Sequence, residues 1–140
     1  MEILITTSNF LLLGLIVLAP ILTLTILKRL KTKKTVLIYF LIGLPTLGML
    51  ILFFAWWGNE SNLILLKHYG YNIDGMSEME YYGNILPENL DKVKSLEIST
   101  MGIGWPLHAI FGWVMIIPYL IIVYFGKAFI DRKIVNKNAE

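Results

Sequence analysis

The chain has 140 residues, of which 56% are hydrophobic and 16% charged, and its mean hydropathy is +0.67. Soluble domains have an apolar share of about 45–50%, so this composition excludes an ordinary soluble domain and indicates a single membrane domain. The net charge is +2, and the chain has no cysteine, which excludes disulfides, thiolate metal sites and a cysteine nucleophile.

Three apolar segments without charged residues dominate the sequence. They are Phe10–Leu27, Val36–Trp57 and Leu107–Phe125, with 18, 22 and 19 residues. A helix of about 20 residues crosses a hydrocarbon core of ~30 Å, and a bilayer leaves unpaired backbone groups without water, so these segments must be helical. The sequence therefore predicts an all-α membrane protein, a single domain over residues 1–140 with three transmembrane helices.

Charge is distributed unevenly between these segments. The run Lys28–Lys34 carries five positive charges, and the tail 126–140 carries four more, whereas the connection 58–104 has seven acids against three lysines. Short loops rich in Lys and Arg stay in the cytoplasm. We therefore expect an N-out, C-in arrangement, with the loop 28–35 and the tail 126–140 in the cytoplasm and residues 58–104 as an outer segment with a net charge of −4.

Aromatic residues near the ends of the apolar segments fit this arrangement, because Trp and Tyr concentrate at membrane–water boundaries. We expect Trp56, Trp57 and Trp105 at the outer boundary and Tyr39, Tyr124 and Phe125 at the inner one.

The outer segment has signs of its own small structure. Leu63–Leu66 followed by Gly70 predicts a short helix at the interface, and Asp74 with the following glycine predicts a turn. Pro87 predicts the start of a second short amphipathic helix, after which residues 96–99 alternate between apolar and polar. The pattern predicts a partly helical module rather than a plain loop.

The third apolar segment has two unlike faces. Small and polar residues recur at helical spacing on one face, and we expect this face to contact protein, since glycines permit close helix packing and Tyr and His need partners. Its members are His108, Gly112, Met115, Tyr119, Ile122 and Gly126. The opposite face is aliphatic and expected to face lipid; its members are Ile110, Val114, Ile117 and Ile121.

His108 is the candidate for cofactor contact, together with Trp105 and Tyr119. A histidine near the outer boundary can contact a quinone, a lipid headgroup or a haem, or act as a proton-sensitive switch. A bis-histidine haem needs two ligands, and His108 is the only histidine in an apolar segment, so a haem would be shared with a partner. The competing interpretation is a histidine at a helix start that bonds to the outer segment.

Support for catalysis or a dedicated metal site is weak, and we expect no catalytic residues and no metal. Ser99, Glu97 and His108 provide the residue types of a triad without a pattern that fixes their geometry. Acids near His68 have no recognised ligand spacing. The three apolar segments contain no Asp, Glu, Lys or Arg, the groups on which transporters generally depend.

These features favour a protein that acts by binding. We expect an accessory or assembly subunit of a larger membrane complex, or an inhibitor or immunity-type partner, in the bacterial inner (plasma) membrane or alternatively the mitochondrial inner membrane. The partner-contact candidates are Tyr69, Tyr71, Tyr81, Tyr82, Gly112 and Met115. The alternatives are an electron-transfer subunit with a shared quinone or haem site and, third, a lipid-modifying enzyme. The basic loop is explained by topology and anionic lipid, so no nucleic acid is expected.

Overall fold

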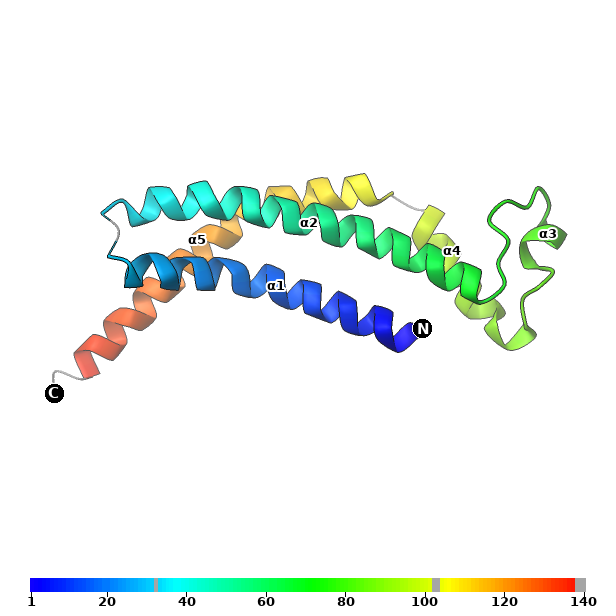
Figure 1. The fold of residues 1–140 in the computed structure, drawn as a ribbon, viewed down its shortest axis with the longest axis horizontal. Helices are drawn as coiled ribbons and strands as arrows, with labels where there is room; N and C mark the ends of the chain where they lie inside the picture. Colours follow the sequence, from blue (N-terminus) through cyan, green and yellow to red (C-terminus); the bar gives the residue numbers. More distant parts are fainter. Residues whose placement is uncertain (32, 102–103, 138–140) are drawn as a thin grey trace.

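The computed structural model describes the backbone of residues 1–31, 33–101 and 104–137, with side chains described for all of these except 101 and 132–137. Every element in this part of the chain is helical (Figure 1). The elements are α1 Glu2–Arg29, α2 Thr35–His68, α3 Glu78–Tyr82, the 3-10 helix η1 Pro87–Asn89, α4 Leu90–Met101 and α5 Trp105–Lys137.

Within the described residues, three helices are long and apolar enough to cross a membrane: α1, α2 and the Trp105–Asp131 part of α5. This confirms the predicted all-α class with three candidate spans. Each helix extends beyond the apolar segment that predicted it, because a helix continues through polar residues once its first turns have formed.

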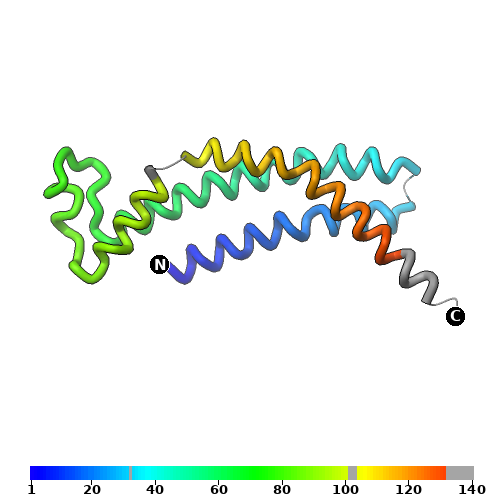
Figure 2. The backbone as a smooth tube through the Cα atoms, turned by 180° about the vertical axis from the view of Figure 1, so that it is seen from behind, coloured from blue at the N-terminus to red at the C-terminus, as the bar shows by residue number. Residues whose placement is uncertain are grey.

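The three long helices form an elongated bundle. α1 and α2 run side by side in opposite directions, and α5 begins alongside α2 and then crosses α1 at an angle (Figures 1 and 2). The bundle core consists of buried residues from all three helices: Leu24, Leu27, Tyr39, Leu47, Ile116 and Leu120.

Glycines determine how closely α2 and α5 approach. A Cβ atom added at Gly48 would lie 2.7 Å from the Trp113 ring, and one at Gly112 would lie 2.5 Å from Cγ2 of Ile51. Gly43 likewise receives the side chain of Leu120, at 3.0 Å from such a Cβ atom. Large side chains of each helix therefore fill the spaces that glycines leave on the other, which is the packing expected between membrane helices.

The face of α5 that packs inside this chain is displaced by one residue from the predicted one. The side chains of Ala109, Ile116 and Leu120 are buried, whereas His108, Met115 and Ile122 are exposed. Each buried residue directly follows a predicted one, a rotation of about 100° around the helix. Leu120 on this buried face packs against Gly43, and contact of the exposed residues with a partner protein stays a prediction. Gly112 and Tyr119 are partly buried, and the aliphatic face is exposed as predicted.

Tyr39 has a packing role that the sequence did not predict. Its side chain is 0% exposed, and its hydroxyl donates a hydrogen bond of 3.3 Å to the carbonyl oxygen of Leu120. Tyr39 therefore joins α2 to α5 inside the bundle, and its position at the inner membrane boundary stays a prediction.

Leu63–Leu66 is not a separate helix. α2 continues without a break through these residues to His68. It ends where the sequence predicts a stop, because Gly70 adopts a φ of +88° and the N–H groups of Gly70 and Tyr71 donate to the carbonyl oxygens of Lys67 and Leu66.

The rest of the connection follows the sequence in part. The turn at Asp74 is confirmed, with the N–H of Gly75 donating to the Asn72 carbonyl oxygen over 3.2 Å. The helix expected at Pro87 is confirmed as η1 followed by α4. Residues 96–99 are helical rather than extended, since α4 continues to Met101. The sequence Gly102-Ile103-Gly104 also predicts a flexible entry to the third long helix, and residues 102–103 lie outside the described residues.

Candidate functional site

Residues 69–101, here called the connecting module, pack around a small core of their own. Leu66 at the end of α2 is buried against Tyr71 and Val93. The Tyr81 ring stacks on the Tyr71 ring, with 5.6 Å between centroids and 11° between planes. The module is therefore a folded unit on the end of α2.

Glu97 organises the tyrosines of the module. The Tyr71 hydroxyl donates to Glu97 Oε1 over 2.9 Å, and the Tyr82 hydroxyl donates to Glu97 Oε2. Burial and this hydrogen bond raise the pKa of Tyr71, and the hydrogen bond to Glu97, with a smaller effect of burial, raises the pKa of Tyr82 to about 12. One carboxylate thus joins α4 to two separate parts of the module.

A second polar contact joins the module to the start of α1. Tyr69 donates to the Glu2 carboxylate, and Lys92 Nζ lies 3.2 Å from Glu2 Oε1 and 5.8 Å from the centroid of the Tyr69 ring. The hydrogen bond to Glu2 raises the pKa of both Tyr69 and Lys92. The module is therefore held to α1 as well as to α2.

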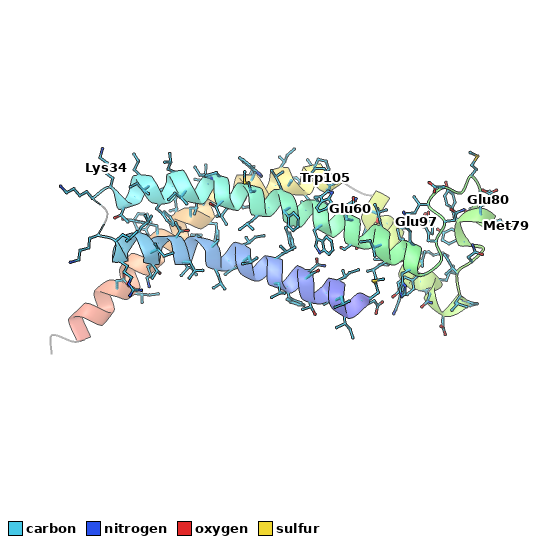
Figure 3. All side chains as sticks on the ribbon, viewed as in Figure 1. Lys34, Glu60, Met79, Glu80, Glu97 and Trp105 are labelled. Atoms are coloured by element: carbon cyan, nitrogen blue, oxygen red, sulfur yellow. The ribbon has the colours of Figure 1, made fainter. Side chains whose placement is uncertain are left out.

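The far end of the module, here called the tip (residues 74–80), presents methionines among acids. Ser77 caps α3 by accepting a hydrogen bond from the N–H of Glu80, and the Glu80 carboxylate accepts one from the N–H of Met76 over 2.8 Å. Met76 is 93% exposed and Met79 is 85% exposed. Figure 3 shows Met79 and Glu80 at the end of the molecule farthest from the α1–α2 loop.

A partly open cavity of about 660 Å³ lies beneath the module, among α1, α2, α4 and α5. Its apolar lining residues and glycines are Ile51, Phe54, Ala55, Gly58, Trp105 and Gly112. Its polar lining residues are Asn9, Asn59, Ser61, Asn62, Ser99 and His108. The volume is within the usual range of ligand pockets, about 300–1,000 Å³.

Asn9 is the unusual member of this lining. Its Oδ1 atom is buried and accepts no hydrogen bond from the described residues. The neighbouring Ser8 accepts a hydrogen bond of 2.9 Å from Trp57 Nε1, which fixes this part of α1 against α2. A buried acceptor without a donor costs about 1–3 kcal/mol, so Asn9 is a candidate for contact with a ligand.

The predicted cofactor residues are only partly brought together. Trp105 and His108 line the same cavity, but Tyr119 lines a smaller apolar cavity of about 230 Å³ with Met115 and donates to the Val17 carbonyl oxygen over 2.8 Å. Gly112 lines both cavities. Trp105 lies at the start of α5, on the side of the bundle nearer the module (Figure 3).

The four predicted tyrosines take different positions. Tyr71 is 5% exposed, so its side chain stabilises the module and has little surface for a partner. Tyr69, Tyr81 and Tyr82 are partly buried, and their contact with a partner stays a prediction.

The three residues of the hypothetical catalytic triad, Ser99, Glu97 and His108, do not act together in the structure. Ser99 and His108 line the cavity, but the Glu97 carboxylate is bound by two tyrosines and the Ser99 hydroxyl donates to the Ser95 carbonyl oxygen. Among the residues that the structure describes, no three His, Asp or Glu side chains gather as a metal site would require.

Sequence reasoning missed Asn9, Asn59 and Asn62. They lie near the ends of two apolar segments, where an asparagine has no pattern that separates it from a boundary residue. The only available signal was the antiparallel pairing of α1 with α2, which places Asn9 near Asn59.

Comparison of the chain with protein-family models, with curated proteins and with solved structures finds no match in any of the three. The fold itself defines the class: an all-helical chain with three helices that are able to span a membrane.

Proposed function

We propose that this protein acts by binding a partner membrane protein, as an accessory subunit or an inhibitor-type partner, and that the tip of the connecting module makes the contact. The protein is inserted N-out, C-in in a bacterial plasma membrane, so the tip projects outside the cell. The observation that supports this proposal is the near-complete exposure of Met76 and Met79 on a folded unit at one end of the molecule.

Methionine suits such a contact because its flexible, polarizable side chain adapts to irregular apolar surfaces. The acids Asp74, Glu78 and Glu80 surround the two methionines in the sequence. The partner surface that fits this tip is an apolar patch bordered by Lys or Arg, since complementary charge guides and orients association. A folded module suits recognition because its backbone is already ordered, so binding loses little conformational entropy.

The test is purification of the intact protein from native membranes in mild detergent, comparing the double variant Met76→Ser, Met79→Ser with Ile98→Ser. Ile98 is a matched control because it is an exposed apolar residue of the same module, on α4. We expect the amount of co-purifying partner to be at least tenfold lower with the double variant than with the wild-type protein. With the control variant, this amount should equal that of the wild-type protein. Recovery of the wild-type protein as a lone monomer, or equal partner recovery with both variants, contradicts the proposal.

Point substitution is preferable to deletion of the tip. Removing residues 74–82 would also remove Tyr81 and Tyr82, which pack on the module core and bond to Glu97. Such a deletion would unfold the module and would not separate a lost contact from a lost structure.

The electron-transfer alternative rests on the shared cavity of Trp105 and His108. In that case a quinone or haem would be held there together with a partner chain. A visible-absorption spectrum of the purified native complex tests the haem case, because haem absorbs above 400 nm, and the same complex with His108→Ala tests whether the haem depends on this cavity. A quinone is tested by organic extraction of the purified complex. The enzyme alternative has less support, since Glu97 is bound to Tyr71 and Tyr82.

A further inference from the structure

We infer that the 660 Å³ cavity binds one uncharged amphiphile, with a hydroxyl-bearing headgroup on its polar side and an apolar portion on its membrane side. The inference is independent of the partner proposed for the tip. It rests on three observations: the lining changes from apolar to polar along α2, it contains no Asp, Glu, Lys or Arg, and the buried Oδ1 atom of Asn9 has no hydrogen-bond donor among the described residues.

The cavity changes from apolar to polar along α2. Ile51, Phe54 and Ala55 line one part, and Asn59 and Asn62 line the part toward the module. These positions extend over about 16 Å of helix at 1.5 Å per residue. Such a gradient matches a molecule with one apolar end and one polar end, and it does not match a small polar metabolite.

The lining chemistry selects an uncharged headgroup. None of the twelve described lining residues is Asp, Glu, Lys or Arg. A phosphate or carboxylate would meet no Lys or Arg there, and His108 is the one described lining side chain that can carry a positive charge. Charged groups are strongly disfavoured where no countercharge or water compensates them. The amides of Asn59 and Asn62, by contrast, both donate and accept hydrogen bonds, as a headgroup with several hydroxyls requires.

Asn9 calls for a donor. Its buried Oδ1 accepts no hydrogen bond from the described residues, and the Ser8–Trp57 hydrogen bond keeps it at the cavity. A ligand hydroxyl supplies the donor after a small rotation about χ2, a torsion with a broad energy well in asparagine. A hydroxyl meets this need, and the carbonyl of an oxidised quinone does not, because it only accepts.

Gly58 provides the decisive variant. It lines the cavity, and a Cβ atom added there would have no neighbour within 4 Å. Gly58→Leu would therefore add a bulky apolar side chain at the cavity wall with room for its Cβ atom. It would also favour the helix, since glycine is a poor helix former. Gly14 on α1 also has no neighbour within 4 Å and does not line the cavity, so Gly14→Leu is the matched control.

The experiment uses the full chain in mild detergent and measures one-to-one lipid adducts by native mass spectrometry. The probes are a galactosyl diacylglycerol, a quinol, phosphatidylcholine and phosphatidic acid. We expect the galactosyl diacylglycerol or the quinol to bind at least tenfold more tightly than the two phospholipids, and whichever binds better identifies the source of the hydroxyl. Preference for phosphatidic acid, or no preference, overturns the inference.

The variants assign the binding to this cavity. Gly58→Leu should weaken the preferred adduct at least tenfold, and Gly14→Leu should leave it unchanged. Asn9→Leu should weaken it about fivefold to tenfold, the effect of one hydrogen bond, and it remains a test if Gly58→Leu does not fold. Unchanged binding in Asn9→Leu, or in a folded Gly58→Leu variant, shows that the lipid binds outside this cavity and overturns the inference.

Discussion

At the scale of single residues, Gly112 is where the bundle has least room. A Cβ atom there would lie 2.5 Å from Ile51 Cγ2, on a β-branched side chain that cannot rotate away freely. We expect Gly112→Ala to destabilise the protein by about 1–3 kcal/mol, the usual effect of overpacking. Gly14→Ala, where space is open, should be neutral or slightly stabilising. Thermal unfolding in detergent compares them, and equal melting temperatures would contradict the α2–α5 packing.

Glu97 and Tyr82 give the module a dependence on alkaline pH. Because the pKa of Tyr82 is raised from 10 to about 12, the folded module keeps a proton that the unfolded chain loses above pH 10. Stability should therefore be fully present below pH 10 and should fall between pH 10 and about 12. Tyr82→Phe should reduce the slope of melting temperature against pH in this range. An identical slope in the variant would show that Tyr82 is not bonded to Glu97.

At the scale of elements, the sequence determined the three long helices well because length and hydropathy alone suffice for a membrane span. Prediction from the sequence failed where tertiary contacts determine the extent of a helix. Asn59–Asn62 resembles a helix boundary, but α2 continues through it because Leu66 packs against Tyr71 and Val93. The cavity was not predictable, since its polar residues come from four helices and meet only through helix pairing.

The attachment of the module to α1 is testable because the chain has no native cysteine. Lys92 Nζ and Glu2 Oε1 lie 3.2 Å apart, so Glu2→Cys combined with Lys92→Cys should react efficiently with a short bifunctional thiol reagent. Glu2→Cys combined with Lys94→Cys is the control, because Lys94 lies two residues further along the same helix. The two residues are about 200° apart around the axis. Equal crosslinking of both pairs would mean that the module is not held against α1.

At the other end of the bundle, Lys28 joins α1 to α5. Its Nζ atom lies 2.5 Å from Asp131 Oδ2, and Lys127 Nζ lies 3.8 Å from Asp131 Oδ1. These groups are about a third exposed, so solvent screens the pair and its contribution to stability is small. We expect Asp131→Asn to lower the melting temperature slightly and the charge-swapped pair Lys28→Asp, Asp131→Lys to restore it. Failure of the swap to improve on either single variant would contradict the contact.

At the scale of the whole molecule, the remaining prediction is orientation. Nine positive charges occur in the loop 28–35 and the tail, and the connection has a net charge of −4, which predicts N-out, C-in insertion. Ser77→Cys should react with a membrane-impermeant thiol reagent on intact cells, and Lys33→Cys should react only after lysis. Both positions are exposed in the structure, so burial does not confuse the result. Labelling of Lys33→Cys on intact cells would show that the loop lies outside and would contradict the predicted orientation.

α2 is a single helix of 34 residues and is therefore about 51 Å long. A hydrocarbon core of ~30 Å accommodates about 20 of these residues, so in the proposed arrangement the helix would project well beyond the membrane with the connecting module on its end. A helix too long for its bilayer leans, and leaning by a further 10° would move the far end of α2 sideways by about 9 Å. A thinner bilayer should therefore increase the tilt of α2 and bring Met76 and Met79 closer to the membrane surface.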